Sequence, residues 1–336
     1  MRHGSKNENS ILKRIFARGA DSAQNLPGRA VRLGIGDDAA LFRPQRAHET
    51  ILTCDWFLEG THFRRDKHSP DAVGWKSLAR ALSDVAAMGG VPRCFLLSLA
   101  LPESHTGPWL DAFLGGLRRA SRKFACTLAG GDTTRRREIL ISVTVVGEIR
   151  STRAVLRSGA RAGDIIYVTG RLGEAELGLR ILMRSKTQPR SSNPLLIKHL
   201  YPEPRLAVGQ WLAQERLATS MMDLSDGLSS DLARLCAASG VSALVDSALL
   251  PVVRPSKAGR GPAFDPLQLA LHGGDDYELL FTVRPSRLNM LPKTLHGVPL
   301  TAIGRITEQR GLVLLKQAER ERQLHPGGWD PFRNTR

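Results

Sequence analysis

The sequence predicts an α/β protein, α+β-like in detail, with two domains at residues 1–150 and 151–336. Apolar runs of strand length alternate with amphipathic stretches of helix length in both halves. The length of 336 residues also suffices for two domains with a sizeable core. Because aromatic residues make up only 5% of the chain, we expect that core to be aliphatic.

The first half begins with a short helix and a polar loop at residues 20–29. Residues 70–88 are the clearest helix, since apolar residues recur at helical spacing and a Gly-Gly pair follows. Residues 130–134 (GGDTT) are expected to form a turn. The expected helices are residues 10–16, 70–88 and 109–124, and the expected strands are residues 30–33, 51–55, 95–101 and 139–146.

The second half begins after a basic loop near Arg150, which sets the expected domain boundary. A polar loop is expected around residues 185–193. Each half contains a Gly-Gly-Asp turn and a Ser-Asp pair beside a helix, a short echo that hints at duplication. The expected helices are residues 173–183, 203–214 and 228–235, and the expected strands are residues 164–170 (a strand into a glycine turn), 220–223, 277–283, 300–303 and 311–315.

The chain is basic, with 48 Lys and Arg against 32 Asp and Glu and a net charge of +16. This balance indicates an anionic partner, such as nucleic acid, a membrane surface or a phosphorylated small molecule, or simply a solvated basic surface. No nucleic-acid module and no bilayer-length apolar run is recognisable, so nucleic acid and membranes are not expected partners. The four cysteines lack the spacing of a zinc or redox motif, and residues 1–9 lack a signal-peptide core, so we expect a reduced cytoplasmic protein.

Acidic turns flanked by small residues recur along the chain. They are residues 34–38 (GIGDD), 53–55 (TCD), 83–84 (SD), 130–134 (GGDTT), 223–227 (DLSDG) and 273–276 (GGDD). Adjacent carboxylates repel one another unless a cation shares them, and Mg²⁺ commonly joins carboxylates to substrate phosphates. Together the turns predict magnesium-assisted phosphoryl transfer. Taken singly, each aspartate is more simply explained as a turn residue or a helix cap than as a ligand, and Asp226 could begin its helix in this way.

Familiar nucleotide-binding signatures are absent from the sequence. It contains no Gly-x4-Gly-Lys-Ser/Thr loop, no Gly-x-Gly-x-x-Gly after a strand and no protein-kinase catalytic loop, so a nucleotide would bind by another architecture. Three further features are compatible with anion binding: the 130–134 turn through its backbone amides, Arg157 as a bidentate donor, and His62 as a donor. Their simpler interpretations are a tight turn, a solvated arginine and an isolated histidine.

In chain order, these motifs resemble the thiamine-monophosphate kinase family over residues 30–330. That family belongs to a superfamily with aminoimidazole ribonucleotide synthetase and selenophosphate synthetase. The matching stretches are residues 34–40 (GIGDDAA), 55–63 (ending EGTHF), 82–89 (LSDVAAMG), 130–135 (GGDTTR), 157–160 (RSGA), 164–170, 223–228 (DLSDGL) and 273–279 (GGDDYEL). The resemblance implies ATP-dependent phosphorylation of thiamine monophosphate to thiamine diphosphate, by direct in-line transfer with several Mg²⁺ ions. It also implies a homodimer paired through the N-terminal sheets and an active site between the domains.

The resemblance also implies a set of site residues. Metal ligands would be Asp38, Thr53, Cys54, Asp55, Asp84, Asp132, Asp223 and Asp226. ATP contacts would be Gly131, Asp132, Arg157 and Ser225, substrate contacts His62, Asp275 and Trp329, and catalytic groups Asp55, Asp132 and Arg157. Cys54 stands where the family usually has a hydroxyl residue, so that its backbone carbonyl would be the ligand.

Besides Cys54, this chain departs from the family pattern at three positions. Asp275 replaces the usual glutamate, Trp329 replaces a tyrosine, and Ala81 stands where asparagine is common. A relaxed or different phosphate-monoester acceptor is therefore an alternative. The enzymatic alternative is aminoimidazole ribonucleotide synthetase, which residues 59–63 argue against. A non-catalytic nucleotide or nucleic-acid binder is the alternative from another class, but it would not need so many carboxylates.

Overall fold

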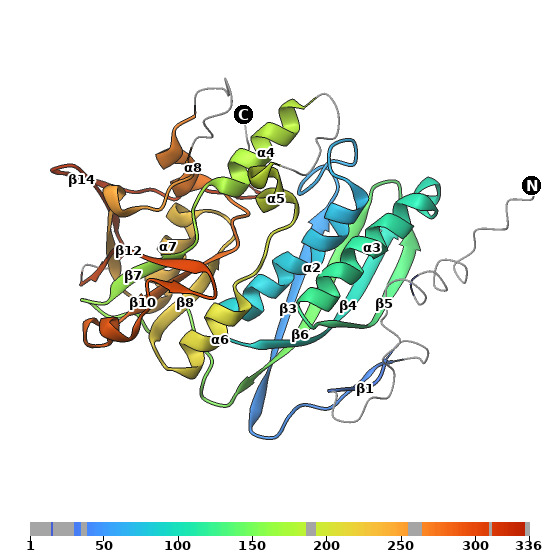
Figure 1. Cartoon of the computed structure of the whole chain (residues 1–336), viewed down its shortest axis with the longest axis horizontal. Helices are drawn as coiled ribbons and strands as arrows, with labels where there is room; N and C mark the ends of the chain where they lie inside the picture. Colours follow the sequence, from blue (N-terminus) through green and yellow to red (C-terminus); the bar gives the residue numbers. More distant parts are fainter. Residues whose placement is uncertain are drawn as a thin grey trace, which may run out of the picture. The chain divides into compact units, whose positions relative to one another are not determined.

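The computed structural model of the chain describes residues 15, 30–34, 39–185, 193–254, 264–308 and 311–332. It is a mixed α/β fold, which confirms the predicted class (Figure 1). The chain forms two compact units: unit 1 is Met1–Val85, Gly90–Thr152 and Ser185–Arg190, and unit 2 is Ala86–Gly89, Arg153–Arg184 and Ser191–Arg336. Within the described ranges, every helix is too short or too polar to cross a membrane.

Unit 1 is built on a four-stranded sheet in the order β3-β6-β4-β5. Its strands are β3 (His48–Leu58), β6 (Leu140–Arg150), β4 (Val91–Leu101) and β5 (Thr127–Arg135). Only the β4–β5 pair is parallel. The helices α2 (Pro70–Ala87) and α3 (Pro108–Lys123) lie across one face (Figure 1), and the smaller elements are η1 (Glu103–His105) and a hairpin of β1 (Val31–Leu33) and β2 (Leu41–Phe42).

The two helices of unit 1 approach closely at glycines. A Cβ on Gly74 of α2 would collide with the Phe113 carbonyl oxygen, and one on Gly116 of α3 would collide with the Asp71 carbonyl oxygen. The helices cover one face of the sheet, and Ile51 and Phe57 of β3 are buried there. The opposite face keeps apolar side chains exposed: Leu52 is 71% exposed, Trp56 55% and Leu96 39%.

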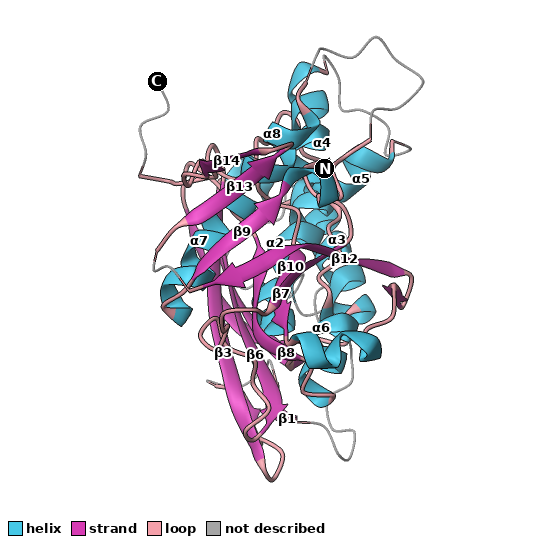
Figure 2. Cartoon of the chain, turned by 90° about the vertical axis from the view of Figure 1, so that its left-hand side faces the viewer, coloured by secondary structure: helices cyan, strands magenta, loops and turns pink. Residues whose placement is uncertain are grey.

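Unit 2 is built on an eight-stranded sheet in the order β14-β13-β9-β12-β7-β10-β8, with β11 paired to β12. Its strands are β7 (Ile165–Thr169), β8 (Ala218–Leu224), β9 (Ser242–Asp246), β10 (Glu278–Val283), β11 (Thr294–Leu295), β12 (Val298–Thr307), β13 (Val313–Gln317) and β14 (Arg320–Gln323). The strands β13 and β9 run parallel and side by side, whereas the other pairs are antiparallel (Figure 2).

The helices of unit 2 complete its aliphatic core. They are α4 (Glu174–Arg184), α5 (Pro194–Leu200), α6 (Leu206–Gln214), α7 (Leu228–Ser239), α8 (Pro266–His272), η2 (Ser247–Leu249) and η3 (Pro285–Met290). Leu228, Leu232 and Leu235 of α7 are almost fully buried with Ile166 of β7 and Leu280 of β10. The predicted aliphatic core is therefore confirmed for this unit.

The structure corrects several predicted elements. Residues 130–134 are not a turn but part of β5, because Gly131 pairs with Leu97 of β4 so closely that a Cβ would collide with the Leu97 carbonyl oxygen. The helix expected at 203–214 starts at Leu206, since Pro204 holds the preceding residue extended. The elements β2, β9, β11, β14, α5 and α8 were not predicted, and residues 10–16 and 20–29 lie outside the described residues apart from Ile15.

Candidate functional site

Three of the predicted ligands of unit 1 project between β3 and α2. Thr53 and Asp55 alternate with Cys54 along β3, so they share the face that α2 covers. The Thr53 hydroxyl donates to Asp84 Oδ2 of α2 at 2.5 Å. Arg80 Nε, one helical turn earlier, lies 3.4 Å from Asp55 Oδ2. The structure thus places Thr53, Asp55 and Asp84, which we call the Thr53 group, on the facing sides of β3 and α2, with Arg80 beside Asp55.

Cys54 points to the other face of β3. Its Sγ lies 3.3 Å from Ser142 Oγ and 3.4 Å from Thr144 Oγ1, both on β6. The thiol is therefore separated from the Thr53 group by the strand itself. Of the oxygen and sulfur atoms of Cys54, only the backbone carbonyl therefore remains a candidate ligand, as the resemblance allows.

Gly131 and Asp132 lie on β5, at the far side of the sheet from β3. Asp132 is paired with Ser98 of β4, which in turn faces Ser142 of β6 and Trp56 of β3. Paired residues in a sheet share a face, so this register puts Asp132 on the exposed face with Trp56 and not with Asp55. Asp132 Oδ1 accepts the Thr133 N–H at 2.8 Å. The structure does not join Asp132 to the Thr53 group, and its role as a ligand stays a prediction.

His62 lies in the turn that follows β3. Glu59 fixes this turn, since its Oε2 accepts the Ile139 N–H at 2.9 Å and its Oε1 pairs with Arg65 at 2.5 Å. His62 Nδ1 accepts the Leu58 N–H at 3.0 Å. The neutral ring therefore carries its proton on Nε2, which makes this nitrogen the donor.

In unit 2, the turn between β8 and α7 carries three of the predicted residues. Asp223 is the buried penultimate residue of β8, and Ser225 and Asp226 follow it half-buried. Arg234 Nη1 of α7 contacts Asp226 Oδ2 at 2.5 Å and Asp231 Oδ1 at 2.7 Å. One arginine therefore compensates two carboxylates at the start of α7.

Asp231 is a member of this turn that the sequence reasoning missed. Its Oδ2 accepts the N–H groups of Asp226 and Gly227, each at 3.1 Å. Burial, and then the charge of Asp226, raise the pKa of Asp231 to about 6. The sequence did contain a signal for this role, since Asp231 lies in the first turn of a predicted helix. Acidic residues there commonly accept hydrogen bonds from the backbone N–H groups that the helix leaves unpaired.

Two other segments are hydrogen-bonded to the same turn through their backbones. The Asp275 N–H donates to the Ser225 carbonyl at 2.8 Å, and the Trp329 N–H donates to the Asp226 carbonyl at 2.9 Å. The Tyr277 N–H donates to Leu224 O at 2.9 Å. The structure thus brings Ser225, Asp226, Asp275 and Trp329 together from three distant parts of the chain.

The segment that carries Trp329 is held by α7 as well. The N–H groups of Gly327 and Gly328 donate to the hydroxyls of Ser229 and Ser230, both at 3.1 Å. A Cβ on Gly328 would collide with the Asp226 carbonyl oxygen, so only glycine allows this close approach. Ser229 Oγ also lies 2.8 Å from His272 Nδ1 of α8. The position of Trp329 is therefore determined by these two serines and glycines.

Arg157 is exposed in the segment that runs beside β8. The adjacent Leu156 carbonyl accepts the Met221 N–H at 3.0 Å, and the Arg157 carbonyl accepts from Ser239 Oγ at 2.9 Å. Its backbone is fixed and its guanidinium reaches solvent. This placement is compatible with both the solvated arginine and the phosphate contact.

The donors in both units are hard oxygen atoms, which suit Mg²⁺. Asp38 lies outside the described residues. Among the residues that the structure describes, no group of three or more His, Cys, Asp and Glu side chains could hold a metal ion. Mg²⁺ usually binds one or two protein carboxylates and completes its shell with water and substrate phosphates, so it does not require a larger group.

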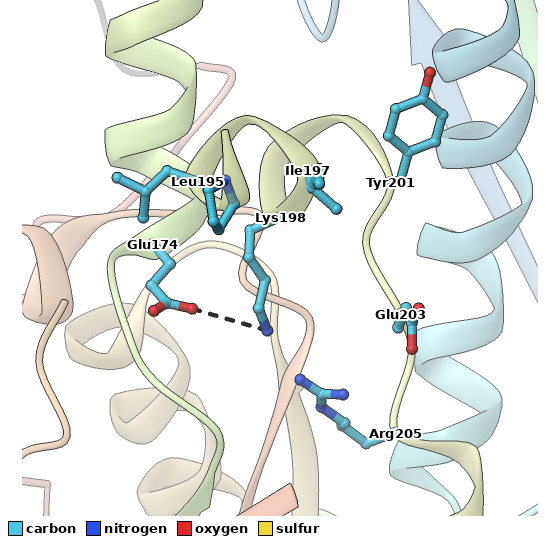
Figure 3. A pocket seen from close by; sticks show the side chains of 8 residues that line it. Glu174, Leu195, Ile197, Lys198, Tyr201, Glu203 and Arg205 are labelled. Atoms are coloured by element: carbon cyan, nitrogen blue, oxygen red, sulfur yellow. Dashed lines mark ion pairs between the residues drawn. The ribbon is translucent and has the colours of Figure 1, made fainter. Parts of the chain in front are cut away.

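A cavity of about 310 Å³ in unit 2 contains none of these residues (Figure 3). Lys198 and Arg205 point toward one another in it, and both contact the buried Glu278: Lys198 Nζ at 3.2 Å, and Arg205 through Nε at 2.6 Å and Nη2 at 2.5 Å. Burial alone would raise the pKa of Glu278, but these two cations hold it below its ordinary value. Since Glu174 also lies 3.9 Å from Lys198, the cations are compensated within the protein.

Comparison with known proteins identifies the family. Residues 36–149 match the AIR synthase related protein N-terminal domain, and residues 161–321 match its C-terminal domain. Thiamine-monophosphate kinase of Escherichia coli (strain K12) is 38% identical over 324 residues, covering 93% of this chain and 94% of that protein. The crystal structure of thiamine-monophosphate kinase from Stenotrophomonas maltophilia K279a has a TM-score of 0.77 at 35% identity, covering 92% of this chain and 95% of that one.

A structure of AaThiL complexed with AMPPCP and TMP has a TM-score of 0.73 at 36% identity, covering 89% of this chain and 92% of that one. The similarity therefore extends over both units and nearly the whole length of each relative. The chain belongs to the thiamine-monophosphate kinase family.

Proposed function

We propose that this chain transfers the γ-phosphoryl group of ATP to the phosphate of thiamine monophosphate, giving thiamine diphosphate and ADP. Family membership supports the reaction. The single structural observation that carries it is the backbone-linked group of Ser225, Asp226, Asp275 and Trp329. By the resemblance, this group combines a nucleotide contact, a metal ligand and two acceptor contacts. Such an arrangement would fix the acceptor relative to the nucleotide, and positioning is a large part of phosphoryl-transfer catalysis.

The proposed nucleotide contacts are Gly131, Asp132, Arg157 and Ser225. The Arg157 guanidinium can bind phosphate oxygens bidentately and stabilise the charge that develops on them. Gly131 is a proposed nucleotide contact by the resemblance alone, because the space beside its Cα is taken by the Leu97 carbonyl of β4. His62 is proposed to donate from Nε2 to the anionic acceptor, because the Leu58 N–H already fixes its other nitrogen.

The proposed ligands for Mg²⁺ are Thr53, Asp55, Asp84, Asp223 and Asp226, together with Asp38, Asp132 and the Cys54 carbonyl. When bound, Mg²⁺ supplies neutralisation of the phosphate charge and favours an in-line geometry. The protein's own side chains also contact these acids: Thr53 binds Asp84, Arg80 lies beside Asp55, and Arg234 binds Asp226. These contacts orient the half-buried carboxylates.

We further propose that the chain is a homodimer that pairs through the exposed face of the unit 1 sheet. On this face, apolar surface of Leu52, Trp56 and Leu96 is exposed to water. A contiguous apolar patch of this kind commonly marks an interaction surface. A second copy would bury the same residues from both sides, as a two-fold interface requires. The four cysteines are free thiols in the structure, which is compatible with the proposed cytoplasmic location.

The experiment is to incubate the protein with Mg²⁺, ATP and thiamine monophosphate and to measure thiamine diphosphate as its fluorescent thiochrome derivative. We expect product only when all three are present. An Arg153→Gln variant, which changes an arginine outside the proposed contacts, should give as much product as the wild type. Absence of product from a folded protein that binds ATP by calorimetry would refute thiamine monophosphate as the acceptor.

A further inference from the structure

Asp275 is held by two residues that the proposed reaction has not yet used. The Tyr277 hydroxyl donates to Asp275 Oδ1 at 2.8 Å, and His199 Nδ1 lies 3.9 Å from Asp275 Oδ2. Tyr277 is 2% exposed and the His199 side chain 1%, whereas the Asp275 side chain is 32% exposed. Two buried groups therefore contact a carboxylate that itself reaches the surface of unit 2.

The backbone around Asp275 is fixed in an unusual conformation. Asp275 and Tyr277 have positive φ values of 67° and 49°, which side-chain-bearing residues seldom adopt. Such residues persist where the surroundings over-determine them, and they cluster at functional sites. Here the surroundings are the bonds to the carbonyls of Ser225 and Leu224, and those from the Gly173 and Ala175 N–H groups to Asp276.

Charge indicates which part of the acceptor Asp275 would meet. A carboxylate repels a phosphate unless a cation intervenes, so an acceptor contact at Asp275 favours the organic end of the substrate. Thiamine monophosphate offers a carboxylate two groups there: the amino group of its pyrimidine ring and the positive charge of its thiazolium ring. Both are recognised by a fixed hydrogen-bond acceptor of negative charge.

We propose that Tyr277 and His199 are positioning residues, which orient the Asp275 carboxylate and thereby set the affinity for the organic part of the acceptor. This inference rests on the proposed function. The hydroxyl of Tyr277 fixes one carboxylate oxygen, and the imidazole of His199 faces the other. Neither residue touches the transferred phosphoryl group in this proposal, so neither contributes to the chemical step.

The test compares steady-state kinetics of Tyr277→Phe and Asp275→Asn with the wild type. Tyr277→Phe should raise the KM for thiamine monophosphate about five- to tenfold, with kcat and the KM for ATP within about twofold. Adding Tyr277→Phe to Asp275→Asn should cause no further loss, because the hydroxyl acts only through the carboxylate. His199→Gln is expected to follow Tyr277→Phe.

Tyr167→Phe is the matched control. Tyr167 lies on β7, where it pairs with Phe281 of β10 and its ring stacks on the Phe281 ring at 5.5 Å, so the variant loses a tyrosine hydroxyl of unit 2 at a position opposite Phe281 and not beside Asp275. It should leave the KM for thiamine monophosphate unchanged. The inference is overturned if Tyr277→Phe leaves that KM unchanged, or if its effect adds fully to that of Asp275→Asn.

Two further measurements separate the possible failures. A wild-type protein that binds thiamine monophosphate by calorimetry without turnover would refute the kinase reaction alone, and the same variants would then be compared by Kd. A protein that neither binds nor converts it would refute both proposals. Oxythiamine monophosphate, which lacks the amino group but keeps the thiazolium charge, identifies the recognised group. If the wild type binds it more weakly than thiamine monophosphate, and Asp275→Asn does not distinguish the two compounds, the recognised group is the amino group.

Discussion

Replacing Arg205 by alanine should destabilise unit 2 strongly. Glu278 has no exposed surface and is bound by Arg205 through two hydrogen bonds, by Lys198 at 3.2 Å and by the Thr169 hydroxyl at 2.6 Å. Removing one partner of a buried ion pair costs about 3–5 kcal/mol, because the other charge is left without compensation. Lys198 and Thr169 remain in the variant, so we expect a loss of about 3 kcal/mol, or roughly two powers of ten in the unfolding constant.

The loss should depend on pH in a defined direction. In the wild type the pKa of Glu278 lies below its ordinary value, so this group contributes stability above its unfolded pKa and loses it as the pH falls. Without Arg205, burial dominates and the pKa of Glu278 rises. The difference between the two proteins should therefore be largest near neutral pH and shrink toward pH 4, where Glu278 takes up a proton.

Urea denaturation followed by circular dichroism at several pH values measures this difference. The double variant Arg205→Met with Glu278→Gln is the control, since it removes both charges and keeps similar volumes. It should lose less stability than Arg205→Ala alone. A loss below about 1 kcal/mol at pH 7, or a loss that does not change with pH, would refute the argument that Arg205 compensates a buried charge.

Three further predictions concern catalysis, pH and assembly. Asp55→Ala and Asp132→Ala should each lower kcat by about 100-fold or more in the thiochrome assay while the melting temperature stays close to that of the wild type; retained activity would contradict the proposed ligand roles. Burial raises the pKa of Asp276 to about 7, so the folded state keeps a proton that the unfolded chain loses above about pH 4, and stability should fall as the pH rises from 4 to 7; Asp276→Asn should remove that part of the slope in urea titrations, and an unchanged slope would contradict the shift. Trp56→Glu should shift the protein from dimer to monomer in sedimentation velocity, whereas Lys316→Glu, a charge change in unit 2, should not; a dimeric Trp56→Glu protein would exclude this face as the interface.

The elements that the sequence predicted well are those with one-sided apolar periodicity. The helices α2 and α3 were expected within one residue of where they lie, because their buried stripes are continuous. The predicted turn at residues 130–134 was wrong, because the Gly-Gly pair, which signals a turn locally, is needed in β5 for close pairing with β4. Tertiary pairing overrides local preference in such strands. The short β9 and α8 carry too few periodic residues to stand out, although Asp265 and Pro266 begin α8 with a recognisable cap.

The predicted site residues came from local motifs, but the residues that hold them could not be found in that way. Arg80 contacts Asp55 from a neighbouring helix, and Tyr277 contacts Asp275 within a strained turn. His199 reaches Asp275 from a distant part of the chain. A local sequence motif does not encode such contacts. The face of Cys54 was predictable, because side chains alternate along a strand. Asp132 was expected with the other ligands because its motif resembles theirs, and only the strand register shows it on the other face of the sheet.

The docking of residues 327–329 on α7 also has a consequence for synthesis. A ribosome makes the chain from its N-terminus, so β8, α7 and the 273–277 segment emerge before Gly327, Gly328 and Trp329. Until those residues have left the ribosome, the Asp226 carbonyl and the hydroxyls of Ser229 and Ser230 lack the N–H groups of Trp329, Gly327 and Gly328 that they accept in the finished protein. A nascent chain halted just before residue 327 would therefore have the sheet of unit 2 but not the completed turn, and premature engagement of the acceptor during translation would be disfavoured.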